Sequence, residues 1–179
     1  MCCLRIALLT LEELYHKHKK QVYNLALHYV QNIEEAQEIT QDVFVSLNNG
    51  LEKFREDSSI DTWIYRITIN KSLDYIKAKN RKKRSGFLVS LFNNISDQLS
   101  YSDFDHPGVL MEQKEAVQSI FFHINKLPAN QKTVLILSKI ESKSQREIAE
   151  ILGISLKAVE SLLQRAKTSL LNKLKPNEG

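Results

Sequence analysis

Cysteine, glycine and proline are all scarce in this chain, and each shortage excludes a class of protein. The 179 residues include two Cys, five Gly and three Pro. Cys2 and Cys3 are adjacent, and no Cys or His at metal-ligand spacing accompanies them, so the sequence predicts neither a disulfide framework nor a metal site. Because Gly and Pro are few and apolar residues recur at helical spacing, the predicted fold class is all-α.

Long apolar runs are missing as well. The segment from Ile6 to Leu11 is too short to span a membrane and lacks a clear secretory cleavage site, so we expect no export signal and a reduced, cytoplasmic chain. No glycine-rich phosphate loop and no set of clustered carboxylates is present. The sequence therefore predicts no enzyme, no cofactor and no small-molecule substrate.

Charge is modest overall but unevenly distributed. The formal net charge is +4, yet Lys77 to Arg84 reads KAKNRKKR, with six basic residues in eight. Such a run is usually a solvated surface or a disordered arm. Next to a second DNA-binding signal, contact with a phosphate backbone becomes the favoured interpretation.

That second signal lies between Ser144 and Leu171. Ser144 and Glu147 have the spacing of a capping box, and Gly153 can take the left-handed conformation that ends a helix. Ser155 can then cap a second helix. Two short helices joined by a glycine turn predict a helix-turn-helix, although a plain helical hairpin would share the pattern. The outer face of the second helix carries donors suited to phosphates and base edges: Lys157, Ser161, Gln164, Arg165 and Thr168.

The remaining pattern divides the chain into two helical domains and a linker. The predicted domains span residues 10–84 and 109–175, and residues 85–108 form the linker. Besides the helix-turn-helix, the predicted helices run from Leu11 to Val30, from Glu34 to Asn49 with Gly50 at the end, from Ile60 to Lys79, from Val109 to Asn125, and from Pro128 to Ile140.

The third of these helices has an unusual side. Trp63, Arg66, Asn70, Asp74 and Lys77 recur at three-to-four spacing, and an aromatic beside cations and amides can bind unpaired bases. A single Trp is more often part of a core, and the pattern alone leaves both interpretations open.

The order of these segments resembles the bacterial RNA polymerase sigma factors of the extracytoplasmic-function (ECF) group, which contain only regions two and four. The likeness covers about Leu11 to Leu174 and is carried by EEAQEITQDVFVSL, FREDSSIDTWIYRITIN and LPANQKTVLIL…REIAEILGIS. It implies an initiation factor that binds core polymerase and promoter DNA and assists promoter melting. It also implies an anti-sigma partner, often one at the inner membrane.

The resemblance assigns roles to three sets of residues. The set that docks on the β′ coiled coil of polymerase is Glu38, Gln41, Asp42 and Val45. The set for the minus-ten element, where a base is flipped out, is Arg55, Asp57, Ser58, Trp63, Arg66, Asn70, Lys77, Arg81, Lys82 and Arg84, with Trp63 supporting the pocket from its core side. The set for the minus-thirty-five element is Lys143, Arg146, Lys157, Ser161, Gln164 and Arg165, and the same domain would contact the β flap.

Two positions depart from the family. Glu160 and Leu162 stand where relatives often carry basic residues. Glu160 either accepts a hydrogen bond from a cytosine amino group or points to solvent, and solvent is the simpler interpretation. Residues 1–9 and the apolar FLVSLF segment of the linker have no family role.

Two other classes of protein remain as alternatives. A helix-turn-helix regulator that binds operator DNA as a dimer would share the C-terminal pattern, but no heptad dimerisation helix supports it. A nucleic-acid enzyme would need a shared set of carboxylates or Cys and His ligands.

Overall fold

The N-terminal helices begin where local capping groups permit. The computed structural model describes residues 10–52, 54, 57–93 and 114–174. Helix α1 (Leu11–Val30) starts with a capping box between Thr10 and Glu13, and α2 (Ile33–Leu51) starts at Asn32, whose side chain accepts from the Glu35 backbone N–H at 2.9 Å. The predicted helix from Leu11 to Val30 and the predicted cap at Asn32 are confirmed.

The end of α2 differs from the prediction. Gly50 lies inside the helix, which continues to Leu51. The C-cap residue, Glu52, keeps a right-handed conformation with φ −65°, so no glycine in the left-handed region is required there.

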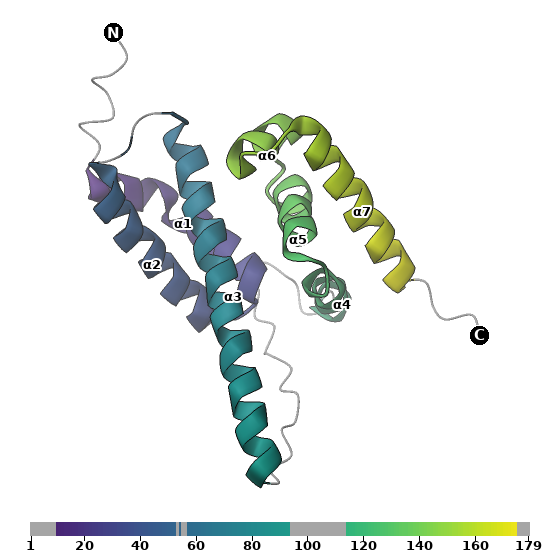
Figure 1. Cartoon of the computed structure of the whole chain (residues 1–179). Coiled ribbons are helices and arrows are strands. Elements are labelled where there is room, and N and C mark those ends of the chain that lie inside the picture. The colour runs from purple at the N-terminus through teal and green to yellow at the C-terminus, as the bar shows by residue number, and fades with distance from the viewer. Residues whose placement is uncertain (1–9, 53, 55–56, 94–113, 175–179) are drawn as a thin grey trace. The chain divides into compact units, whose positions relative to one another are not determined.

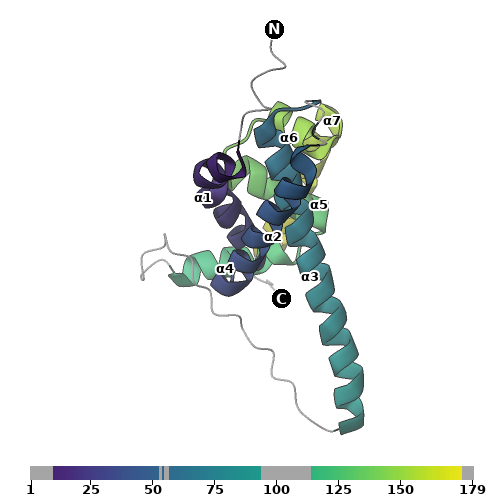
Figure 2. The same cartoon turned by 90° about the vertical axis from the view of Figure 1, so that its left-hand side faces the viewer.

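Helix α3 (Ile60–Asn93) is also longer than predicted, because the sequence pattern predicts an end at Lys79. The stretch that follows Lys79 has no proline, and Lys and Arg are good helix formers, so the helix continues into residues assigned to the linker. Its last turns extend past the ends of α1 and α2 (Figure 1, Figure 2).

The chain divides into two units. The first comprises Met1–Arg55 and Ile67–Asp105, and the second comprises Glu56–Arg66 and His106–Gly179. In the first unit α1 and α2 pack against each other. Its core consists of fully buried apolar side chains at helical spacing, among them Leu14, Val22, Leu25, Tyr29, Ala36, Ile39, Val43 and Leu47. Burial of each large apolar side chain contributes about 1.5–3 kcal/mol.

The second unit contains the C-terminal helices. They are α4 (Lys114–Asn125), α5 (Ala129–Leu135), a π-helical turn (Ile136–Ile140), α6 (Gln145–Leu152) and α7 (Leu156–Leu174). Helix α7 packs on α4, α5 and α6 (Figure 1), and the buried core includes Phe121, Val134, Leu137, Ile148, Val159 and Ala166. The start predicted for α4, at Val109, lies outside the described residues.

Within the described ranges all regular structure is helical, which confirms the all-α class. No helix in those ranges is long and apolar enough to cross a membrane.

Candidate nucleic-acid and partner-docking surfaces

The turn between α6 and α7 is built from local hydrogen bonds. The Ser144 hydroxyl accepts from the Glu147 N–H at 3.3 Å, and the Glu147 carboxylate accepts from the Ser144 N–H at 2.8 Å. Gly153 has φ +64°, and a Cβ there would meet nothing within 4 Å, so the backbone conformation alone selects glycine. The Ser155 hydroxyl accepts from the Ala158 N–H at 3.2 Å. The predicted helix-turn-helix and its caps are confirmed.

The outer face of α7 is open. Lys157, Ser161, Gln164, Arg165 and Thr168 are all exposed, while Val159 and Ala166 on the opposite face are buried. The Arg165 guanidinium lies along the helix, where Nε donates to the Ser161 carbonyl at 3.3 Å and a terminal nitrogen donates to the Ser161 hydroxyl at 3.0 Å. The row of donors therefore faces solvent, with Arg165 held over Ser161.

The two cations proposed near the start of α6 differ in their surroundings. Arg146 is exposed, whereas Lys143 is half-buried, with its ammonium 3.4 Å from the Glu147 carboxylate and 4.8 Å from the centre of the Tyr65 ring. The backbone N–H and hydroxyl of Ser144, aided by Lys143, hold the pKa of Glu147 below its usual value. Lys143 is thus partly engaged within the second unit.

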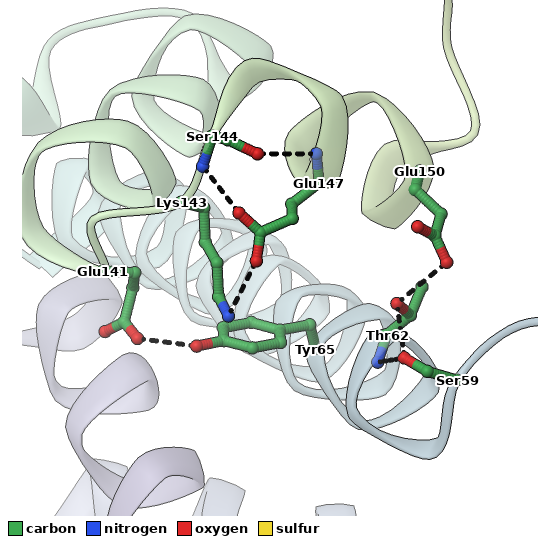
Figure 3. A network of polar contacts seen from close by, with 8 residues as sticks. All are labelled: Ser59, Thr62, Tyr65, Glu141, Lys143, Ser144, Glu147 and Glu150. Carbon is green, nitrogen blue, oxygen red and sulfur yellow. Dashed lines mark hydrogen bonds and ion pairs between the residues drawn. The ribbon is translucent and has the colours of Figure 1, made fainter.

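The first turns of α3 belong to the second unit and contact α6 there (Figure 3). Ser59 caps α3 by accepting from the Thr62 N–H at 3.1 Å, and the Thr62 hydroxyl donates to Glu150 at 3.2 Å. The Tyr65 hydroxyl donates to Glu141 at 2.9 Å. Burial raises the pKa of Glu141, and the Tyr65 hydroxyl and the Lys143 ammonium only partly oppose it.

Arg66 completes this contact. Its Nε donates to the Ile151 carbonyl at 2.9 Å, and a terminal nitrogen donates to the Glu150 carbonyl at 2.7 Å. Carbonyls at the end of a helix have no partner within the helix, and a cation is favoured there. The structure therefore places Arg66, predicted as a phosphate contact, on the C-terminal end of α6.

Other members of the predicted minus-ten set are more accessible. Asp57, Asn70, Lys77, Arg81 and Lys82 are exposed, and Lys77 pairs with Asp74 at 3.1 Å. Ser58 and Trp63 are half-buried. Arg55 and the side chain of Arg84 lie outside the described residues.

The proposed docking residues share one face of α2. Glu38, Gln41, Asp42 and Val45 are exposed, and Val45 is 59% accessible, which is unusual for an aliphatic side chain. Burial, together with the nearby carboxylates of Glu35 and Glu38, raises the pKa of Tyr75 to about 12.

Sequence reasoning did not find Tyr15 beside this face. The Tyr15 ring is 43% accessible and packs edge-on against Phe44, with the ring centres 4.8 Å apart. A Tyr at helical spacing fits a buried core position as well as an exposed one, so the sequence does not distinguish the exposed Tyr15 from a core residue.

Metal ligands do not cluster in the described part of the chain, where no three His, Cys, Asp or Glu side chains come together.

A helix-turn-helix with an open row of donors defines a DNA-binding protein, and comparison with known proteins narrows the class. Residues 14–82 match Sigma-70 region 2, and residues 123–170 match Sigma-70, region 4. RNA polymerase sigma factor YlaC of Bacillus subtilis is 30% identical over 163 residues, which is 90% of each chain. The ECF RNA polymerase sigma-E factor of Escherichia coli K12 is 27% identical over 161 residues, covering 89% of this chain and 84% of that protein.

Solved structures agree in fold. CnrH in complex with the cytosolic domain of CnrY aligns with a TM-score of 0.62 and 25% identity, covering 94% of this chain and 89% of that one. The sigma factor RpoE of Bartonella quintana, in complex with the anti-sigma factor NepR, aligns with a TM-score of 0.66 over 93% of this chain and 98% of that one, at 17% identity. The chain belongs to the ECF group of RNA polymerase sigma factors and is a transcription initiation factor.

Proposed function

We propose that the two domains predicted from the sequence divide the work of initiation between them. Residues 10–84 dock on core polymerase and bind the minus-ten element, residues 109–175 bind the minus-thirty-five element as duplex, and residues 85–108 join them. The observation that carries this proposal is the pair of exposed faces, one on α2 and one on α7, each backed by its own buried core. The protein acts by binding and has no catalytic activity of its own.

Helix α7 is the proposed recognition helix. In a helix-turn-helix the second helix enters the major groove and its N-terminal part contacts base edges. Ser161, Gln164 and Arg165 are exposed on that part of α7 and have the chemistry for base contacts, and Lys157 and Arg146 can neutralise phosphates. Lys143 supports the same contact from the start of α6.

The exposed side of α3 is the proposed surface for the minus-ten element. Asn70 can form hydrogen bonds with an extruded base, and Lys77, Arg81 and Lys82 offer cations to the strand along the same helix. Extrusion costs a few kcal/mol, which a preformed site offsets. Arg66 binds the α6 carbonyls in this structure, so contact with a phosphate requires it to leave them.

The α2 face is the proposed docking surface for the β′ coiled coil. Val45 supplies an apolar centre, and Glu38, Gln41 and Asp42 supply a polar rim, the composition expected of a protein interface. The C-terminal unit is proposed to contact the β flap.

An anti-sigma factor is a further proposed partner. CnrH and the Bartonella RpoE were both solved with partner proteins, the cytosolic domain of CnrY and the anti-sigma factor NepR. We infer that this chain also binds an anti-sigma factor, either in the cytoplasm or at the inner membrane when that factor is membrane-bound.

The test is co-migration of the purified chain with core polymerase in size exclusion. We expect the wild-type chain to co-migrate and Asp42→Arg to lose co-migration, because charge reversal places a cation at the centre of the polar rim. The matched control is Glu12→Arg, which reverses an acid on the exposed first turn of α1.

The DNA-binding activity of the full-length Asp42→Arg chain separates the outcomes. Retained binding to a minus-thirty-five duplex supports a specific docking defect, and loss of both activities indicates misfolding. Failure of the wild-type chain to join polymerase would favour an independent operator-binding regulator.

A further inference from the structure

The helix-turn-helix contains an acid that the fold itself does not use. Residues 141–174 include four carboxylates, Glu141, Glu147, Glu150 and Glu160. Glu141 accepts from Tyr65, Glu147 accepts from the Ser144 backbone, and Glu150 accepts from Thr62. Glu160 has neither a hydrogen-bond donor nor a cation within bonding distance among the residues that the structure describes, and it is exposed.

Helix capping does not account for Glu160 either. Ser155 caps α7 through the Ala158 N–H, so the position that a capping-box acid would occupy is Ala158. Glu160 lies two residues later, beyond the first turn. In α6 the acid at the corresponding position is Glu147, and its carboxylate has a structural role because it completes the capping box with Ser144.

The neighbours of Glu160 belong to the proposed DNA-contacting row. Lys157 precedes it by three residues and Gln164 follows by four, and such spacings place side chains next to one another on a helix surface. Both neighbours are exposed, and Glu160 lies in the N-terminal part of α7 that a recognition helix presents to base edges. It is the only acid on α7.

An ionised carboxylate restricts what can lie opposite it. It accepts hydrogen bonds and donates none, so it repels phosphates and the acceptors of guanine and thymine. In the major groove the donors are the amino groups of cytosine and adenine, and the adenine amino group stands beside the N7 acceptor, which an amide side chain matches better. Cytosine is therefore the base that suits an unpaired glutamate.

We propose that Glu160 is a specificity-determining residue whose carboxylate accepts a hydrogen bond from the amino group of a cytosine in the duplex that α7 contacts. This inference rests on the proposed placement of α7 in the major groove. Glu160 selects by exclusion as well as by attraction, since guanine and thymine offer its carboxylate only acceptors and adenine places the N7 acceptor beside its amino group.

The experiment is selection from a duplex library randomised over the minus-thirty-five element, using polymerase reconstituted with the full-length chain. The variants are Glu160→Ala, Glu160→Gln and the control Glu12→Ala, which removes one negative charge from an exposed site on α1. We expect wild type and control to enrich cytosine at one position by roughly 5- to 150-fold, the range for one good side-chain-to-base contact.

The two Glu160 variants give different expected results. Glu160→Ala loses the cytosine preference at that position, keeps the preferences elsewhere, and binds duplexes without that cytosine more tightly than wild type does. Glu160→Gln keeps a weaker preference for cytosine. Its amide oxygen still accepts from the cytosine amino group, but its own amino group can now donate to acceptors on other bases.

Other outcomes would overturn the inference in distinguishable ways. An unchanged cytosine preference in Glu160→Ala, or an equal loss at all positions, refutes the role of Glu160 and leaves the proposed function intact. Enrichment of no sequence by the wild-type complex refutes the proposed function together with the inference.

Discussion

Replacement of Arg165 by alanine tests the proposed recognition helix most directly. In the free protein the guanidinium donates to the Ser161 carbonyl at 3.3 Å and to the Ser161 hydroxyl at 3.0 Å. Both residues are exposed, so water competes for the same groups and the two bonds together contribute on the order of 1 kcal/mol. A bidentate contact between an arginine and a guanine contributes about 1–3 kcal/mol of discrimination. The guanidinium is therefore expected to leave Ser161 for the base.

The assay is fluorescence anisotropy of labelled minus-thirty-five duplexes at one salt concentration. We expect Arg165→Ala to weaken binding to the preferred duplex by about 1–3 kcal/mol and to relax selectivity at one base pair. Arg165→Lys should lose most of the same selectivity, because an ammonium cannot form the two parallel bonds of a guanidinium.

The control is Asn172→Ala, at an exposed position near the end of α7, which should bind as wild type does. A loss in Arg165→Ala that is equal for every duplex sequence would refute base contact and assign Arg165 to the phosphate backbone.

Two further predictions concern charge. Lys82→Ala should reduce the slope of log affinity against log salt concentration for promoter binding by about one. The reason is that Lys82 is exposed on α3 and its contact with a phosphate would release one counterion. An unchanged slope would place Lys82 away from DNA. Lys132 is buried, and burial lowers its pKa to about 8. Below that pH, charged Lys132 therefore lowers the free energy of unfolding by about 3 kcal/mol. Stability measured by urea unfolding should therefore rise as pH increases from about 8 to about 10.4 in the wild type. Lys132→Met should lack this rise between about pH 8 and about pH 10.4, and a variant that keeps the rise would contradict the reasoning.

Much of the helix-turn-helix was determined by sequence alone because its signals are local. A capping box joins residues three apart, and a glycine at a helix end acts through its own backbone conformation. Ser144, Gly153 and Ser155 therefore predicted the boundaries of α6 and the start of α7, and the apolar spacing predicted which face of α7 is buried.

The tertiary structure decided what the polar side chains contact. The partners of Tyr65 and Arg66 lie 76 to 85 residues away in the chain, and no periodicity encodes such a pairing. The burial of Lys132 could not be predicted from the sequence either, because its position in the helical pattern fits an exposed face as well as a buried one. Local propensity sets where helices begin and turn, whereas long-range packing decides which charges remain free to bind DNA or a protein partner, because burial and hydrogen bonding depend on groups brought together only by the fold.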